Sequence, residues 1–322
     1  MVPGTTTGAS NRKAGMSAAE QQITIPVRLR ETLGASEDAS GAAWLESLPE
    51  LARELMDRWK LTLERVFEPG GRTSLVLYVR RDDDSPAVLK LGLPCPEADS
   101  EHAALAHWDG RGAVRLFEAA PEQRGMLLER LHGEVPLLSL AESKAMLEAA
   151  GTLQRLWVAP PAGHAFTSVA ERVAGLCANL RRRRELPAGP ELRPLLDEAL
   201  AVADDLLADP AEELLLHGDF HHGNVLAAER SPWLAIDPRP LVGERAYDLA
   251  WLAQDRLETL AGVPGPQAAA RRRLQRLSDA VDVDRDRLRG WALFRTVEAG
   301  SRSLEAGDTR RAELFLEFAA ML

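Results

Sequence analysis

Side chains that could do chemistry are concentrated in one short segment, LLLHGDFHHGNVL, at residues 214–226. It holds three of the chain's seven histidines, an aspartate and an asparagine: His217, Asp219, His221, His222 and Asn224. Imidazole and carboxylate groups are good zinc ligands, so a zinc site is one interpretation. A polar turn is another, in which the glycines allow unusual dihedrals and the aspartate and asparagine cap backbone amides.

Phosphoryl transfer is the third interpretation of this segment. Asp219 and Asn224 fit the spacing D-x-x-x-x-N, in which the carboxylate accepts a hydroxyl proton and the amide oxygen binds Mg²⁺. A second carboxylate should then follow the next strand, to bind the metal that bridges the phosphates. Asp237 ends the apolar stretch WLAID, and Pro238 would stop that strand.

The same chemistry requires a lysine on an earlier strand to neutralise the phosphates. Lys90 lies in AVLKLGL, between apolar neighbours, and is comparable to the lysine of V-A-I-K. Glu101, in the next predicted helix, is the acid expected to hold this lysine. The alternatives are a surface lysine at a strand end and an ordinary solvent-facing glutamate. Because all these demands are met in order, the sequence favours phosphoryl transfer.

Two blocks, HGDFHHGN and AIDP, resemble the H-G-D-x-H-x-x-N and I-D signature of the aminoglycoside phosphotransferase superfamily. Residues 214–252 are similar, more narrowly, to the streptomycin 6-phosphotransferase and hydroxyurea phosphotransferase subgroup, and the likeness is looser from Gly41 to Gly133. The resemblance implies transfer of a phosphoryl group from ATP (or GTP), with Mg²⁺, to a hydroxyl of an aminoglycoside or amino sugar. Its role would be antibiotic resistance. A kinase for a metabolite or hydroxyurea, and a nucleotide-binding pseudokinase, are the alternatives.

This resemblance also implies residue roles. Asp219 would be the catalytic base, Asn224 and Asp237 the Mg²⁺ ligands, Lys90 the partner of the α- and β-phosphates and Glu101 the group that positions Lys90. Backbone groups at the strand end LLERL would contact adenine, at Glu129 and Leu131. In place of a complete G-x-G-x-x-G, the turn EPGGRTS would approach the phosphates, although an ordinary hairpin turn is the alternative for its members: Gly70, Gly71, Thr73 and Ser74.

The remaining predicted roles concern loop support and the acceptor. Three residues are expected to brace the catalytic loop: His217, His221 and Asp248. Besides Asp219, acceptor contacts are expected among the C-terminal helices, where each candidate has ordinary helix surface or core as its alternative: Trp251, Asp255, Glu258, Trp291 and Glu298.

Patterning predicts a small β-rich lobe followed by a larger helical lobe, and the resemblance implies an α+β, bilobal, protein-kinase-like fold. Residues 1–22 are expected to form a disordered tail, 23–131 a β-rich nucleotide-binding lobe and 132–322 a mainly helical lobe. In the first lobe, a helix near 41–60 and one near 97–108 accompany five strands, of which the first three form an antiparallel meander: 61–68, 74–81, 86–93, 113–120 and 125–131.

The second lobe is expected to be mostly helical from the end of HGEVP onward. Helices are predicted near 140–158, 168–184 and 190–208, the first two opened by the capping boxes Ser139–Glu142 and Ser168–Glu171. Short strands at LLLH, NVLAA and WLAID surround the catalytic loop, and four helices follow Arg245.

Composition narrows the class of protein. The 322 residues carry a net charge of −10, which disfavours nucleic acid and suits a cationic small molecule, although solubility alone also explains acidity. No run reaches the roughly 18–20 apolar residues of a membrane span, so a cytoplasmic location is expected. The expected oligomeric state is a monomer or a homodimer. Cys95 and Cys177 are expected to be reduced structural thiols, and the run Arg181–Arg184 a solvated helix end.

Overall fold

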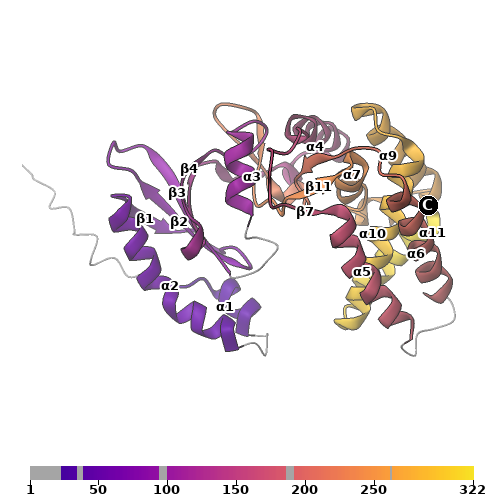
Figure 1. Ribbon diagram of the computed structural model, residues 1–322, viewed down its shortest axis with the longest axis horizontal. Helices are drawn as coiled ribbons and strands as arrows, with labels where there is room; N and C mark the ends of the chain where they lie inside the picture. Colours follow the sequence, from indigo (N-terminus) through magenta and orange to yellow (C-terminus); the bar gives the residue numbers. More distant parts are fainter. Residues whose placement is uncertain (1–22, 35–38, 94–99, 186–191, 262) are drawn as a thin grey trace, which may run out of the picture. The chain divides into compact units, whose positions relative to one another are not determined.

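The computed structural model describes residues 23–34, 39–93, 100–185, 192–261 and 263–322. It divides into two compact units, Met1–Leu93 and Pro94–Leu322 (Figure 1). The lobe boundary after residue 131 stays a prediction, and the tail predicted at 1–22 lies outside the described residues.

The first unit is a pair of helices with an antiparallel meander. Helices α1 (Val27–Gly34) and α2 (Ala39–Arg58) precede three strands: β1 (Thr62–Val66), β2 (Ser74–Arg80) and β3 (Pro86–Gly92). The predicted meander is confirmed, since β1 pairs with β2 and β2 with β3, both antiparallel. Alternate residues of β2 and β3 are fully buried, as strand periodicity requires: Leu75, Leu77, Val79, Ala87, Leu89 and Leu91. Helix α1 has no counterpart among the predicted elements.

The second unit begins with one helix and a hairpin. Helix α3 (Glu101–Trp108) is followed by β4 (Leu116–Ala120) and β5 (Gly125–Glu129), which pair antiparallel. The predicted face of α3 is confirmed, because Glu101, Leu105 and Trp108 are all buried.

Two small sheets then surround the predicted catalytic loop. One has the order β10–β9–β6, from Trp233–Ala235, Val225–Ala227 and His132–Pro136; the other has the order β7–β11–β8, from Thr167–Ser168, Leu241–Gly243 and Leu214–Leu216. The sequence indicated strands at β8, β9 and β10 but none at β6, β7 or β11. HGEVP was expected to lead into helices, and it forms β6 because β9 supplies its hydrogen-bonding partner.

Helices make up most of the remaining chain: α4 (Glu142–Leu156), α5 (Val169–Arg184), α6 (Leu192–Ala208), α7 (Arg245–Ala253), α8 (Glu258–Ala261), α9 (Pro266–Val281), α10 (Arg285–Glu305) and α11 (Thr309–Met321). The prediction of four helices after Arg245 missed the single turn α8. Helix α10 is the core element, and its Trp291 packs edge-on against Tyr247 of α7.

Only one of the two predicted capping boxes forms. Ser168 Oγ accepts the N–H of Glu171 at 3.1 Å, and Glu171 Oε2 accepts the N–H of Ser168 at 2.8 Å. The box at Ser139 and Glu142 is wrong, because α4 begins at Glu142 itself, with Ala141 as its N-cap. Glu142 instead forms an ion pair with Arg273 of α9.

The basic run at the end of α5 is only partly solvated. Arg181, Arg182 and Arg184 are exposed, whereas Arg183 is 7% exposed. The Arg183 guanidinium contacts α10, where it donates to Ser301 Oγ at 3.1 Å and forms ion pairs with Glu298 and Glu305. The prediction of a solvated run is therefore wrong at this residue, where tertiary contacts supply acidic partners.

The structure bears on part of the predictions about the two cysteines and about membrane spans. Cys177 is a buried free thiol, and burial raises the pKa of that thiol, while Cys95 lies outside the described residues. None of the helices in the described part of the chain is long and apolar enough to cross a bilayer. Location and oligomeric state stay predictions.

Replacing Arg183 with alanine should lower the free energy of unfolding by roughly 3 kcal/mol, because Glu298 would keep its charge in a buried position with less compensation. Arg182→Ala is the matched control, since Arg182 is exposed and should cost under about 1 kcal/mol. Urea unfolding of both variants measures the difference. Equal losses would contradict the buried ion pair as the source of stability.

Candidate active site

Asp248 of α7 holds the start of the loop that follows β8. Its side chain is fully buried and accepts the backbone N–H groups of His217 and Gly218, both at 2.9 Å. The indole N–H of Trp157 donates to the same carboxylate at 3.2 Å. Because an unpaired buried N–H is costly, this acid determines where the loop begins. These contacts are the ones that the predicted bracing role requires.

Gly218 cannot be replaced by another residue without moving the chain. Its φ is +76°, and an added Cβ would lie 1.9 Å from the carbonyl oxygen of Arg239. The N–H of Arg239 donates to the carbonyl of His217 at 2.8 Å. The loop and the segment after β10 are therefore in direct backbone contact.

His217 braces the loop with both ring nitrogens. Nδ1 accepts the N–H of Asp219 at 3.3 Å, so the proton is assigned to Nε2, which donates to the Ile236 carbonyl at 3.0 Å. The ring also packs edge-on against Phe220. Burial lowers the pKa of His217 below its ordinary value, since no water solvates the charged form. The histidine is therefore a neutral support.

The two loop residues that are predicted to take part in the chemistry are hydrogen-bonded to each other. Asn224 Nδ2 donates to the backbone carbonyl of Asp219 at 3.0 Å, which turns the amide oxygen of Asn224 the other way. The Asn224 carbonyl accepts the N–H of Ile236 at 2.9 Å. The Asp219 side chain is 19% exposed, and its Oδ2 lies 3.4 Å from Nε of Arg239. Arg239 was not singled out from the sequence, because only the tertiary structure places it beside the carboxylate.

Asp237 lies just after β10, two residues beyond the end of the strand. Its backbone is in the left-handed region at φ +55°, which is uncommon for residues other than glycine, asparagine and aspartate. Asp237 is exposed and Pro238 is buried. The predicted strand ran to Asp237, and the change to φ +55° explains why it ends earlier. Such strained backbone is often found at functional sites.

The two adjacent histidines have different partners. His221 Nδ1 accepts the N–H of Gly223 at 3.1 Å, within the loop. His222 is fully buried, and its N–H and Nδ1–H both donate to Asp255 Oδ2, at 2.8 and 2.6 Å. The sequence assigned no role to His222 and placed Asp255 among the acceptor contacts. The doublet of histidines was the only local signal for this link.

Zinc ligation does not match this geometry. His217 uses both ring nitrogens for bonds to protein groups, and His221 and His222 each use Nδ1, while Nε2 of His222 is buried with no partner among the described residues. In the described part of the chain, no group of three histidine, cysteine or acidic side chains is arranged to hold a metal ion.

Lys90 and Glu101 are both buried, at 7% and 5% exposure. Lys90 lies on β3 opposite Val76 of β2, and Glu101 is the first residue of α3. Buried charges need charged or hydrogen-bonding partners, so neither is an ordinary surface residue. Their roles at a nucleotide stay predictions, as the two residues belong to different compact units.

The glycines of the turn EPGGRTS are explained by local packing. Gly70 has φ +84°, and an added Cβ would lie 2.7 Å from Pro26 Cβ. At Gly71 it would lie 2.6 Å from Ser74 Oγ. Ser74 is buried and Thr73 exposed. A tight turn accounts for both glycines, and contact with phosphate stays a prediction.

The strand end at Glu129 is held by an arginine that the sequence analysis did not single out. Arg230 Nε donates to both Glu129 oxygens, at 2.8 and 3.0 Å, and its Nη1 donates to the Gly110 carbonyl at 2.7 Å. The Glu129 N–H donates to the Arg115 carbonyl, and the Leu131 carbonyl accepts the N–H of Gly133. The remaining backbone groups at this strand end are the ones relevant to the predicted adenine contact.

The acceptor candidates occupy different environments. Trp251 is half-buried, with the Arg295 guanidinium 3.7 Å from its ring centroid, and Glu258 is exposed at the start of α8. Trp291 and Glu298 are buried residues of α10, and the indole of Trp291 donates to Glu244. Both lie in the core, and their contact with an acceptor stays a prediction.

Replacing Asp248 with asparagine should lower the free energy of unfolding by roughly 2–3 kcal/mol, because one N–H would face an NH₂ group instead of an oxygen. Urea unfolding measures this loss. Asp286→Asn, at an exposed position of α10, is the control and should change little. Full stability of Asp248→Asn would contradict the described role of the carboxylate.

Acid should weaken the fold through His217. Its folded pKa is lowered, so its contribution to stability is complete above the ordinary value of about 6.5 and is lost as the pH falls below it. Urea midpoints at pH 7.5 and 5.5 measure this slope, which His217→Asn should reduce. His132→Asn, at a half-exposed histidine, should leave the slope unchanged. An unaltered slope in His217→Asn would contradict the assignment.

Comparison with known proteins places the chain in a family. The aminoglycoside/hydroxyurea antibiotic resistance kinase family matches residues 58–307. Streptomycin 6-kinase of Streptomyces glaucescens is 37% identical over 288 residues, which cover 89% of this chain and 92% of that protein. Hydroxyurea phosphotransferase of Kitasatospora aureofaciens is 37% identical over 306 residues, covering 93% of this chain and 86% of that protein.

Solved structures show the same fold at low sequence identity. Aminoglycoside phosphotransferase APH(4)-Ia has a TM-score of 0.58 at 15% identity, covering 87% of this chain and 98% of that one. Choline kinase LicA from Streptococcus pneumoniae also has a TM-score of 0.58, at 10% identity, covering 85% and 100%. The predicted α+β, protein-kinase-like fold is confirmed. The chain is a small-molecule phosphotransferase that belongs to the aminoglycoside/hydroxyurea antibiotic resistance kinase family.

Proposed function

We propose that this protein transfers the γ-phosphoryl group of ATP to a hydroxyl of a streptomycin-like aminoglycoside. The observation that carries the proposal is the loop in which Asn224 is hydrogen-bonded to the backbone of Asp219. This contact holds a carboxylate and an amide oxygen on one short segment, as phosphoryl transfer demands. Nucleotide use is supported by the ternary complex of the fold neighbour APH(4)-Ia with ADP and hygromycin B.

Asp219 is the catalytic base of this proposal. Its carboxylate takes the proton of the acceptor hydroxyl, whose oxygen then forms a bond to the γ-phosphorus. The bond from that phosphorus to the β,γ-bridging oxygen breaks, and ADP leaves. Because a dissociative transfer needs little covalent chemistry from the protein, positioning of the hydroxyl and charge neutralisation provide most of the rate.

The donor set at the loop fits Mg²⁺. Asn224 offers its amide oxygen, since its NH₂ group is held by Asp219, and Asp237 offers an exposed carboxylate. Amide and carboxylate oxygens are the ligands that Mg²⁺ prefers, and the ion would offset phosphate charge. Lys90 would contact the α- and β-phosphates, with Glu101 positioning it. Backbone groups of the EPGGRTS turn would lie near the phosphates, and those at Glu129 and Leu131 near adenine.

A cationic aminoglycoside is the substrate class best supported. Two streptomycin 6-kinases, from Streptomyces glaucescens and Streptomyces griseus, match about nine-tenths of the chain at 37% and 35% identity. The net charge of −10 would favour a polycationic acceptor electrostatically. Hydroxyurea is the second candidate, because the hydroxyurea phosphotransferase is also 37% identical.

An ADP-release assay with Mg-ATP tests this function against streptomycin, other aminoglycosides, amino sugars and hydroxyurea. We expect turnover with streptomycin, and Asp219→Ala should lower kcat by roughly 10²- to 10⁴-fold while ATP binding is retained, because only the proton acceptor is lost. Asp237→Ala should abolish Mg-dependent nucleotide binding. Asp205→Ala, at an exposed position of α6, is the control and should leave both readouts unchanged.

The outcomes separate the candidates. Turnover with hydroxyurea alone would favour the second candidate over the first. Nucleotide binding without ADP release on the whole panel would contradict both and favour a pseudokinase or a metabolite kinase. Unchanged turnover of Asp219→Ala would overturn the assignment of the base.

A further inference from the structure

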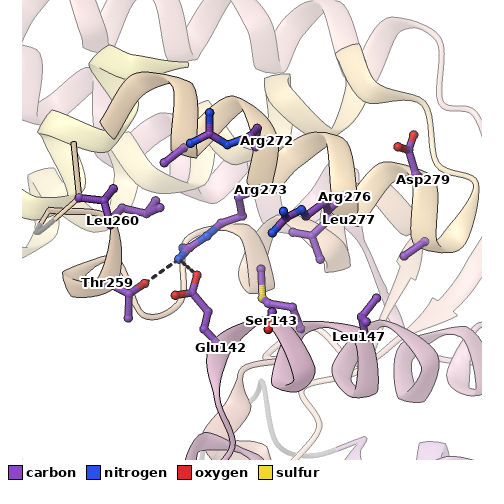
Figure 2. A pocket seen from close by; sticks show the side chains of 14 residues that line it. Glu142, Ser143, Leu147, Thr259, Leu260, Arg272, Arg273, Arg276, Leu277 and Asp279 are labelled. Carbon is purple, nitrogen blue, oxygen red and sulfur yellow. Dashed lines mark hydrogen bonds and ion pairs between the residues drawn. The ribbon is translucent and has the colours of Figure 1, made fainter. Parts of the chain in front are cut away.

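A large pocket lies between α4, α8 and α9. Its volume is about 970 Å³, and none of the residues that line it belongs to the loop 217–224 or is Asp237. This volume is at the upper end of the range of small-molecule sites, roughly 300–1,000 Å³. Figure 2 shows side chains of α4 and α9 facing one another across it.

Apolar side chains form much of the wall. Leu147 of α4 is 64% exposed, and Val263, before α9, is 39% exposed. Leu260 and Leu277 line the same pocket and are buried. Leu260 is also part of a core cluster with Leu257, so this part of the wall is anchored in the fold. Together these side chains give the pocket an apolar wall, as small-molecule sites have.

Basic side chains outnumber acidic ones in the lining of the pocket. Arg273 is already neutralised, because its Nη2 lies 2.5 Å from Glu142 Oε1 and donates to Thr259 Oγ1 at 2.9 Å (Figure 2). Asp279 accepts from the neutral amide of Gln275 and keeps its negative charge, so the lining carries three arginines against two acidic residues. Arg272 and Arg276 are exposed lining residues, and neither is in an ion pair within the described parts of the chain.

These two cations are neighbours on one helix. Arg272 and Arg276 are four residues apart on α9, a spacing at which like charges repel each other. The chain has 49 acidic residues against 39 basic ones, yet among the described residues no carboxylate pairs with either. The pocket is therefore a local positive site on an acidic protein.

We propose that this pocket binds an amphipathic organic anion, with an aryl or acyl body against Leu147, Leu260 and Val263. Its carboxylate, sulfonate or phosphate group would contact Arg272 and Arg276, since guanidinium groups match such oxygens in bidentate geometry. The same arginines repel a polycationic aminoglycoside. The ligand of this pocket is thus opposite in charge to the proposed phosphoryl acceptor.

Titration of the full chain with 8-anilinonaphthalene-1-sulfonate, followed by fluorescence, tests the proposal. We expect saturable binding of one molecule per chain. Arg272→Gln/Arg276→Gln should weaken that binding about 10-fold, because two attractive charges are lost at short range. Neutral N-phenyl-1-naphthylamine has the same aromatic body without the sulfonate, and its affinity should change less than about twofold. Leu147→Asn should weaken both probes.

Arg271→Gln is the matched control, because Arg271 is an exposed neighbour on α9 that does not line the pocket. It should leave sulfonate binding unchanged. Three results would overturn the proposal: equal weakening by Arg271→Gln, unchanged sulfonate affinity in the double variant, or binding that does not saturate. Urea midpoints equal to that of the unaltered chain show that the double variant is folded, since both arginines are exposed.

Discussion

The buried carboxylate of Asp248 accepts two consecutive backbone N–H groups at the start of the loop 217–224, those of His217 and Gly218. The Asp248 carboxylate is fully buried, so its oxygens must find hydrogen-bond donors inside the protein. A buried backbone N–H group without an acceptor would also be costly. The two hydrogen bonds to the Asp248 carboxylate determine where β8 ends. The next residue, Asp219, follows a position that only glycine fits, because a Cβ at Gly218 would lie 1.9 Å from the Arg239 carbonyl oxygen.

A second set of contacts joins the loop to segments far away in the sequence. His217 reaches Ile236, Asn224 reaches back to the Asp219 carbonyl, and His222 is held by Asp255. Asp255 is tied further, because the Arg273 guanidinium donates to its backbone carbonyl at 2.8 Å. His217 is suited to this work, since burial lowers the pKa of its ring and both ring nitrogens bond to backbone groups of the protein.

Arg273 also connects the loop to the pocket between α4, α8 and α9. Its guanidinium is buried, is hydrogen-bonded to Glu142 and lines that pocket. The pocket and the loop consequently share one supporting side chain, although they differ in the sign of the charge that they favour. Acidic composition and relatives named for streptomycin support a cationic acceptor, whereas Arg272 and Arg276 favour an anion.

Local patterns determined the parts of this protein that depend on neighbours in the sequence. Strand alternation predicted β1 to β3, S-x-x-E spacing predicted the cap at Ser168, and D-x-x-x-x-N with Asp237 indicated a phosphotransferase. Only the tertiary structure decided which polar groups meet across long separations. In the tertiary structure Glu142 forms an ion pair with Arg273 rather than capping a helix. Arg183 is buried against α10, and His222 pairs with Asp255. The reason is physical: backbone periodicity and turn chemistry act within a few residues, whereas the partner of a buried charge depends on how distant helices pack.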